Sequence, residues 1–312
     1  MTELISIVIP TFNEQGNVNA LYRKLKSALN RNKYELIFVD DGSKDNTLSE
    51  LNKLRKSDKR VKVISFTKNF KKASALAAGL KMASGKTIVT MDADLQDNPS
   101  EIPKLLGKLD QGFDIVIGWR YNRKDSFSKF LASKIFNFLV RTITRLKIHD
   151  CDCNFRAMRK EVVPHLELYS GLYRYIPVIT FKKGFKVGEV KIKHSPRFSG
   201  KSKYGIARLP AGFFDLITIK FLTEYNKRPL HLFGGIGTLL LGLGFIAGLY
   251  LLYLKFILGL AIGQKPMLIL TILLIFIGIQ FVSIGLIGEM IANQREKNEY
   301  VIKEKHGFNR SN

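Results

Sequence analysis

Thr87-Ile-Val-Thr-Met-Asp-Ala-Asp-Leu-Gln96 is the stretch that decides the fold, because a short apolar run ends here on two carboxylates. The β-branched residues from Thr87 to Met91 predict a buried strand. Carboxylates two positions apart point to the same face of a strand, so Asp92 and Asp94 can converge on one cation where the chain turns. Mg²⁺ and Mn²⁺ favour oxygen ligands and share carboxylates with substrate phosphates. The stretch therefore predicts a divalent-metal site, with Gln96 adding a carbonyl; a solvated turn is the alternative.

Apolar runs of the same kind recur on both sides of this stretch. They predict strands at Ile5–Ile9, Glu35–Val39, Val61–Phe66 and Asp114–Gly118. Helical patterns lie between them, among them Val18–Leu29 and a helix that opens at Ser100. This alternation indicates a three-layer α/β domain, in which helices cover both faces of a mainly parallel sheet. Ligands of such sheets bind outside the carboxyl ends of the strands, where Asp92 and Asp94 lie.

Acidic residues also follow the predicted strand that ends at Val39. The sequence there is Val39-Asp-Asp-Gly-Ser-Lys-Asp-Asn-Thr47. Carboxylates at this strand end suit the recognition of ribose hydroxyls or of base N–H groups, whereas Asp45 is expected to cap the next helix. Pro10-Thr-Phe-Asn-Glu14 is a third strand-end element, and its Glu14 is a further candidate contact.

The chain is strongly basic and carries two long apolar runs. Its formal net charge is +24, from 50 Lys and Arg against 26 Asp and Glu. This surplus indicates polyanionic partners, and lipid is favoured over nucleic acid because no zinc-finger or RNA-binding signature is present in the sequence. Leu232–Leu254 and Met267–Gly288 contain no charged residue and are long enough to span a membrane; a buried soluble helix pair is the alternative. Lys and Arg flank this hairpin (residues 230–292), so the positive-inside rule predicts that domain 1–229 and tail 293–312 are cytoplasmic.

Two basic amphipathic segments, at about 123–148 and about 206–225, are expected to lie in the membrane interface. An ordinary surface helix docked on the sheet is the alternative for the first. Residues 182–208 lie between them, with a predicted strand at Val187–His194 and with Glu189 as the only acid among many Lys and Arg. This basic segment suits either a phosphorylated substrate or a solvated face that touches lipid headgroups.

Cys151 and Cys153 are the only cysteines and form no disulfide framework. With His149 they crowd potential zinc ligands into one short stretch without a distant fourth ligand, which makes a poor tetrahedral site. The sequence opens on a strand without a signal-peptide pattern, which again predicts a cytosolic N-terminal part.

Three strand-end motifs, IPTFNE, VDDGSKDNT and MDADLQD, resemble the family 2 glycosyltransferases in order and spacing over roughly residues 4–120. Downstream, HDCDCNFRAMR (His149–Arg159), LYRYIP (Leu172–Pro177) and PRFSGKSKYG (Pro196–Gly205) resemble the branch that glycosylates polyprenyl phosphates, which is similar to dolichol-phosphate mannose synthase and bactoprenol glucosyltransferases. The resemblance implies a glycosyltransferase A-type fold with a two-helix transmembrane anchor. It also implies inverting transfer from a nucleotide-sugar donor to undecaprenyl or dolichyl phosphate, with Mg²⁺ or Mn²⁺ as cofactor. Whether the chain forms a homo-oligomer stays open.

The resemblance implies a role for each matching position. The nucleotide-sugar donor would contact Pro10, Phe12, Glu14, Val39, Asp41, Asp92, Ala93 and Arg120. The metal would be held by Asp92, Asp94 and Gln96, and the phosphates and acceptor by Arg156, Arg197, Ser202 and Lys203. The catalytic carboxylates would be Asp94, Asp150 and Asp152. The family's acid before the Phe-Arg pair falls on Asp150, but Asp152 is present too and Cys-Asn replaces the usual small residues before Phe155, so which Asp faces the acceptor stays open, with Asp150 favoured.

A lipid phosphate needs little help from a catalytic base, because a phosphate monoester has its second pKa near about 6 and is mostly dianionic at neutral pH. The reaction needs positive charge instead, from a cation at the diphosphate and from Arg and Lys at the acceptor. Two other functions are weighed against this one. A processive polysaccharide synthase would carry a Gln-x-x-Arg-Trp motif, but the only tryptophan is Trp119. A non-catalytic membrane adaptor with a degenerate transferase domain is opposed by the intact Asp92, Asp94 and Arg197.

Overall fold

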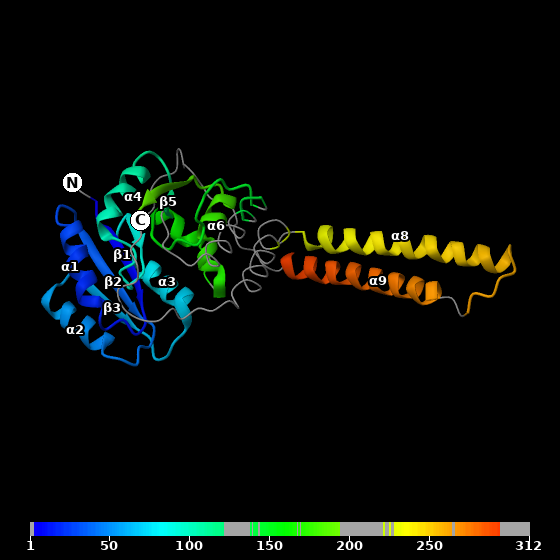
Figure 1. The fold of residues 1–312 in the computed structure, drawn as a ribbon, viewed down its shortest axis with the longest axis horizontal. Helices are drawn as coiled ribbons and strands as arrows, with labels where there is room; N and C mark the ends of the chain where they lie inside the picture. Colours follow the sequence, from blue (N-terminus) through cyan, green and yellow to red (C-terminus); the bar gives the residue numbers. More distant parts are fainter. Residues whose placement is uncertain are drawn as a thin grey trace, which may run out of the picture. The chain divides into compact units, whose positions relative to one another are not determined.

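The computed structural model of the protein describes residues 3–121, 138, 140–142, 144–166, 168, 170–193, 221, 225, 228–263 and 266–293. The chain divides into two compact units (Figure 1). The first contains residues 1–219 together with 301–312, and the second contains residues 220–300.

The first unit is built on one seven-stranded sheet with the order β3-β2-β1-β4-β6-β5-β7. Its strands are β1 (Ile5–Thr11), β2 (Tyr34–Asp40), β3 (Val61–Ser65), β4 (Thr87–Thr90), β5 (Ile115–Arg120), β6 (Arg156–Arg159) and β7 (Val187–Ile192). β1 pairs in parallel with β2 and β4, β2 with β3, and β5 with β7. β6 is antiparallel to both of its neighbours, β4 and β5. The sheet is therefore parallel except for β6, which lies between β4 and β5.

Helices cover both faces of this sheet. They are α1 (Val18–Ala28), α2 (Thr47–Ser57), α3 (Lys71–Met82), α4 (Ile102–Leu109) and α6 (Ile176–Lys182), with the 3₁₀ helices η1 (Pro99–Glu101), η2 (Lys160–His165) and η3 (Ser170–Tyr175). Figure 1 shows α1 and α2 on one side of β1–β3 and α3 on the other. Val8 and Ile37 pack with Leu76 of α3 in one core cluster, and the alternate residues Ile7 and Phe38 are also fully buried. Because successive strand residues point to opposite faces, both faces are buried, as the sequence predicts.

Most predicted strands and helices of this unit are found within one or two residues of their expected ends. β6 was not predicted, and it makes the sheet mixed. The predicted interfacial helix 123–148 falls mostly outside the described residues. Its last part is wrong, because residues 145–148 are not helical and Arg145 has a φ of 60°. The second amphipathic segment, 206–225, also lies outside the described residues except at positions 221 and 225.

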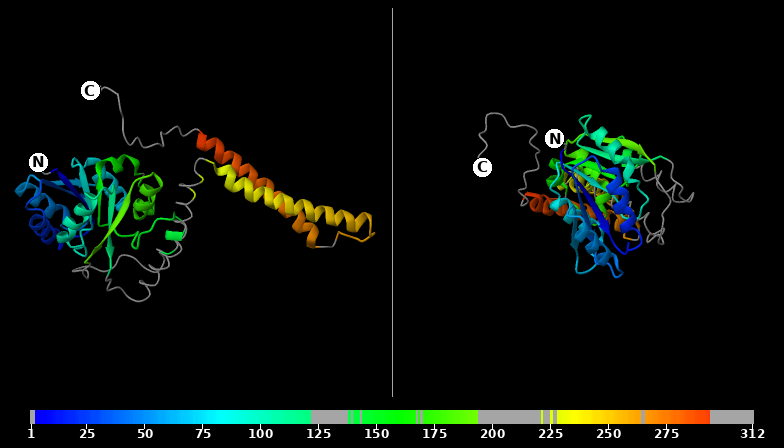
Figure 2. Two further views of the ribbon diagram at one scale, coloured as in Figure 1. Left: turned by 90° about the horizontal axis from the view of Figure 1, so that it is seen from above. Right: turned by 90° about the vertical axis from the view of Figure 1, so that its left-hand side faces the viewer.

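The second unit is a hairpin of α8 (Pro229–Phe256) and α9 (Pro266–Asn293), which run alongside each other (Figure 2). Both are long and apolar enough to cross a membrane, with mean hydropathies of 2.0 and 2.7. They contain the two predicted spans. Glycines bring the helix backbones close together: a Cβ added to Gly237 would lie 2.7 Å from the carbonyl oxygen of Gly278. Where α8 begins and α9 ends, the Leu230 amide donates a hydrogen bond to the Glu289 carboxylate, at 3.2 Å.

Candidate functional site

The loop after β2 is shaped by Gly42, which has a φ of 66°. A Cβ at this position would lie 2.5 Å from the carbonyl carbon of Lys68, so both the conformation and the space require glycine. The two acids before Gly42 have different surroundings. Asp40 accepts hydrogen bonds from the Ser43 amide and the Ser65 hydroxyl, at 3.3 and 3.2 Å, and so ties the loop to β3.

Asp41 lies directly after β2, at the same strand end. It is 4% exposed and accepts a 2.6 Å hydrogen bond from the Phe70 amide, just before α3. Burial raises the pKa of the Asp41 carboxyl, although amide donors partly offset the effect. Asp41 is therefore a well-anchored carboxylate at the carboxyl edge of the sheet, where the sequence predicts a donor contact.

The loops after β1 and β2 are locked together by side-chain hydrogen bonds. The Asn13 amide donates to the Ser43 hydroxyl at 2.9 Å, and the Glu14 amide donates to the Thr47 hydroxyl at 2.8 Å. The Glu14 carboxylate accepts a 2.6 Å hydrogen bond from the side chain of Asn17. Asp45 accepts hydrogen bonds from the amide and hydroxyl of Thr47, the first residue of α2, but the N-cap position itself is Asn46 and not Asp45 as expected.

The other β1 and β2 positions predicted to contact the donor differ in how open they are. Pro10 and Phe12 are partly exposed, and Pro10 lies opposite Val39 in the sheet register. Val39 itself is fully buried, and its carbonyl accepts a 3.0 Å hydrogen bond from the Thr11 hydroxyl. The donor contact that the sequence predicts for Val39 stays a prediction.

β4 ends directly before the predicted metal ligands. Asp94 is 7% exposed, and its carboxylate accepts a 3.2 Å hydrogen bond from the Gln96 amide, which closes a tight turn around Leu95. Leu95 adopts the left-handed conformation, with a φ of 62°. Ala93 between the two acids is buried, so its small side chain packs into the protein. Asp92, Asp94 and the backbone of Gln96 thus belong to one tight turn at the end of β4.

Asp92 has two partners that the sequence did not indicate. The ammonium of Lys72, in the first turn of α3, lies 2.5 Å from one carboxylate oxygen, and the Asn154 side-chain amide donates to the other at 3.4 Å. Burial opposes the ionisation of Asp92, but Lys72 outweighs it and holds the pKa of this carboxyl below its ordinary value. Asp92 is therefore an anion at neutral pH.

Arg120 and Asp150 form a bidentate ion pair at the end of β5. The guanidinium Nε and Nη2 donate to the two carboxylate oxygens at 2.7 and 2.9 Å, and the side chains are 16% and 5% exposed. Burial by itself would lower the pKa of Arg120, but the attraction to Asp150 and to other nearby acidic groups outweighs this effect, so the pKa of Arg120 is raised overall. The structure thus joins a predicted donor-binding residue to a predicted catalytic carboxylate. Asp152 is more open, 36% exposed, and lies 3.5 Å from the guanidinium of Arg174.

Arg156 is the first residue of β6 and follows the loop that carries these acids. It is 1% exposed, and its guanidinium donates to the carbonyls of Cys153 and Tyr173 at 2.6 and 2.7 Å, with a longer contact of 3.5 Å to that of Cys151. Burial lowers the pKa of Arg156. The acceptor contact that the sequence predicts for Arg156 stays a prediction. Its observed partners are backbone groups, an arrangement that fixes the course of this loop.

The remaining predicted phosphate contacts, Arg197, Ser202 and Lys203, lie outside the described residues. In the part of the chain that the structure describes, no three His, Cys, Asp or Glu side chains gather to hold a metal. Cys151 and Cys153 are buried thiols. His149 is turned away from them, because it stacks on Trp119 at 4.0 Å and bonds to Glu189 of β7.

Sequence reasoning missed Lys72 and Asn154. Lys72 follows a predicted strand, since the basic run Lys71-Lys72 comes shortly after β3, and that placement was the available signal. Asn154 carried no such signal, because β6 had not been predicted. Its position depends on a 2.7 Å hydrogen bond from the Thr90 hydroxyl to its carbonyl.

Comparison with known proteins places this site in context. The sequence is 36% identical to the dodecaprenyl-phosphate galacturonate synthase of Rhizobium johnstonii, over 96% of this chain and 92% of that protein. It is 34% identical to the undecaprenyl-phosphate 4-deoxy-4-formamido-L-arabinose transferase of Shewanella sediminis, over 97% and 92% of the two chains.

Among solved structures, the fold is similar to glucosyl-3-phosphoglycerate synthase from Mycobacterium tuberculosis, crystallised with Mn²⁺, uridine diphosphate and phosphoglyceric acid. The TM-score is 0.56 and the identity 18%, over 71% of this chain and 78% of that one. The sequence model of glycosyl transferase family 2 matches residues 6–166, which include every strand from β1 to β6. With its strand-end acids, its A-type fold and relatives that match nearly its whole length, the chain belongs to glycosyl transferase family 2.

Proposed function

We propose that this enzyme transfers a sugar, with inversion, from a nucleotide-sugar donor to the phosphate of a polyprenyl lipid at the cytoplasmic face of a membrane. The observation that carries the proposal is the carboxyl edge of the sheet, where acids from β2 and β4 lie on one side and Arg120 with Asp150 on the other. The proposal is supported by two relatives named for polyprenyl phosphates, whose sequences match this chain over 92% of their length.

The first half of the edge suits the donor. Asp41 supplies an anchored carboxylate for nucleoside hydroxyl or N–H groups, and Phe12 supplies a partly exposed aromatic surface beside it. Lys72 places an ammonium next to Asp92, where it can contact a departing diphosphate. Removing the ammonium would leave Asp92 without its closest cation, so Lys72 also controls the charge of the metal site.

The turn after β4 fits a hard divalent cation. Mg²⁺ and Mn²⁺ are usually bound by one or two carboxylates and complete their coordination with substrate phosphates and water. Asp92, Asp94 and the Gln96 side chain offer oxygen donors of this kind, and the mycobacterial structural neighbour was crystallised with Mn²⁺. A cation here would neutralise charge on the donor's diphosphate.

The second half of the edge suits the acceptor. A dianionic lipid phosphate is already a nucleophile, so the protein has to attract and orient it more than deprotonate it. Arg120 is the cation fixed closest to the acids of this loop, and Asp150 holds its Nε and Nη2 in place. Asp150 therefore acts through Arg120, and the more exposed Asp152, rather than the Asp150 favoured from the sequence, would face the acceptor.

The cytoplasmic orientation rests on charge. Arg228 precedes α8, and Arg295, Lys297, Lys303 and Lys305 follow α9 in the sequence. The last turn of α8 and the connection to α9 carry only Lys255 and Lys265. The positive-inside rule places the more basic side in the cytoplasm, where nucleotide sugars are made.

The test is a transfer assay with purified full-length protein. A panel of nucleotide sugars is offered with citronellyl phosphate, undecaprenyl phosphate or 3-phosphoglycerate as acceptor, with and without a chelator. Turnover with the two prenyl phosphates, abolished by chelation and restored by Mg²⁺ or Mn²⁺, is the expected result. Asp94→Asn should lose activity, while Asp110→Asn, an exposed acid at the end of α4, should keep it. Preference for 3-phosphoglycerate would refute the acceptor, and full activity in the chelator would refute the metal.

A further inference from the structure

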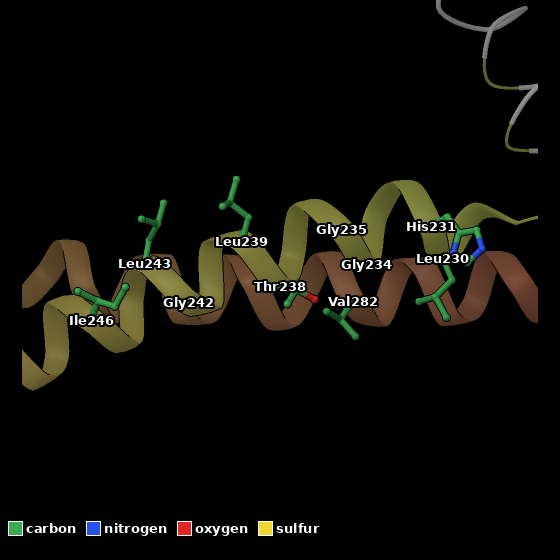
Figure 3. Close-up of a pocket in the computed structure, with 10 residues that line it drawn as sticks. All are labelled: Leu230, His231, Gly234, Gly235, Thr238, Leu239, Gly242, Leu243, Ile246 and Val282. Carbon is green, nitrogen blue, oxygen red and sulfur yellow. The ribbon is translucent and has the colours of Figure 1, made fainter.

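A groove of about 840 Å³ runs along α8, with Val282 of α9 at its edge. Gly235 and Gly242 form its floor, and a Cβ built on either glycine would meet nothing within 4 Å. Figure 3 shows Leu239 and Leu243 standing out from the helix beside these bare positions. Leu239 is 64% exposed, although it would be covered by lipid in a bilayer. The glycines thus make a smooth channel between aliphatic side chains.

The groove has one polar end. His231 lies there, and Ile246 lies at the other end (Figure 3). From residue 230 to residue 246, at about 1.5 Å per residue, the groove is about 24 Å long, most of the ~30 Å hydrocarbon core of a membrane. α8 begins at this end, so the proposed topology puts the polar end of the groove at the cytoplasmic face of the membrane.

The charges at this end favour an anion. Lys227 and Arg228 directly precede α8 in the sequence, and the first turn of a long helix adds a partial positive charge. Glu289 is the opposing acid, and it is already bonded to the Leu230 amide. The two basic residues outnumber it, and the His231 side chain adds a polar group at this end. A chain that is apolar along its length and anionic at its head matches the groove.

A second copy of this helix matches less well. All copies of one chain insert into a membrane in the same direction, so two copies paired along this face would bring their Lys227 and Arg228 residues to the same depth. Like charges at close range oppose such pairing. The close-packed glycine face of α8, at Gly237 and Gly244, is moreover already used by α9.

We infer that the groove along α8 binds the isoprenoid chain of the lipid acceptor, with the phosphate held at the end marked by His231. The inference rests on the proposed function and adds a chain-binding site to it. The bare glycine positions take the methyl branches of the isoprenoid, and the site makes affinity depend on chain length. A short prenyl phosphate reaches only the polar end, so it gains nothing from the rest of the groove.

The test uses the full chain in phospholipid nanodiscs, with the donor found by the panel above. Gly242→Leu puts a branched side chain into the groove at a position where an added Cβ meets nothing within 4 Å. It should raise the KM for undecaprenyl phosphate about tenfold, equivalent to about 1.4 kcal/mol, and leave the KM for citronellyl phosphate unchanged. The matched control is Gly263→Leu, in the connection between the helices, where a Cβ also meets nothing and both constants should stay at the wild-type value.

A second measurement needs no variant. A polyprenyl phosphate with a diazirine in mid-chain is irradiated with the wild-type protein, and the label should map to α8 between residues 230 and 246. Equal labelling of both helices, or an unchanged KM in Gly242→Leu, would overturn the inference. If Gly242→Leu instead separates a wild-type oligomer and leaves KM unchanged, the groove is an interface between copies. Failure of every prenyl phosphate to react would refute the proposed function, and the label position would still decide this site.

Discussion

The ion pair between Arg120 and Asp150 allows a quantitative prediction about this fold. Asp150→Asn leaves a guanidinium that is 16% exposed facing a neutral amide, and Arg120→Met leaves a carboxylate that is 5% exposed without its cation. Breaking a buried pair costs about 3–5 kcal/mol, because the remaining charge stays desolvated. We expect losses of unfolding free energy of about 3 kcal/mol for Asp150→Asn and about 4 kcal/mol for Arg120→Met.

The double variant should lose far less than the sum of these values. With both charges removed, no desolvated ion remains, and we expect a total loss of about 4 kcal/mol and therefore a coupling energy of about 3 kcal/mol. An exposed pair, Lys53 with Glu50, provides the control cycle. Its coupling should stay below about 1 kcal/mol, because solvent screens exposed pairs.

The measurement is urea unfolding in detergent, followed by tryptophan fluorescence. Trp119 is the only tryptophan, it directly precedes Arg120, and it stacks on His149, which directly precedes Asp150. The signal therefore reports the first unit and this site, with no contribution from the helical hairpin. Equal urea slopes among the variants would show that the differences reflect native-state stability. If the loss in the double variant equals the sum of the single losses, the two charges do not act as a pair and the reasoning fails.

Three further predictions concern other parts of the first unit. Gly42→Ala should lower the melting temperature more than Gly112→Ala, since both glycines have positive φ but a Cβ contacts the β3–α3 loop backbone only at Gly42; equal losses would contradict the steric argument. Burial opposes ionisation of Glu35, but its hydrogen bonds and Lys62 hold its pKa below the ordinary value. Thermal melts should show wild type more stable than Glu35→Gln above pH ~4.3, with the advantage lost as the pH falls through the lower folded pKa, whereas a constant difference would contradict it. Burial raises the pKa of Cys151 to about 12 and also raises that of Cys153, so mass spectrometry after N-ethylmaleimide at pH ~8 should find labelled thiols only after unfolding, and native labelling would refute it.

The parallel part of the sheet could be predicted from sequence, because each of its strands is a short apolar run with turn residues after it. β6 could not. Its sequence is Arg156-Ala-Met-Arg159, and a strand with arginine at both ends does not look buried. Arg156 is nevertheless buried, because the carbonyls of Cys153 and Tyr173 accept hydrogen bonds from its guanidinium. Those carbonyls come close to Arg156 only in the folded chain, so the sequence around Arg156 does not predict that it is buried.

The site was predictable in its acids and less so in its cations. Strand-end carboxylates such as Asp92 follow from the rule that ligands of α/β sheets bind at the carboxyl edge. Their partners come from distant parts of the chain. Lys72, which pairs with Asp92, lies in the first turn of the helix before β4, and Asp150 is 30 residues away from Arg120 in the sequence. Pairing across such separations depends on strand order, and the position of β6 between β4 and β5 is the feature that sequence periodicity left undetermined.

The reversed direction of β6 has a consequence for how this enzyme can diversify. Because β6 is antiparallel, its first residue, Arg156, lies beside Thr90 at the carboxyl edge of the sheet, the same edge at which β5 ends with Arg120. The end of β5 and the start of β6 therefore lie at the same edge of the sheet, and the polypeptide between the two arginines connects them. Its length and composition can change while the strands keep their register, since a longer excursion adds only a small closure entropy. Exchanging residues 121–155 between relatives should transfer acceptor preference and leave donor preference with the recipient.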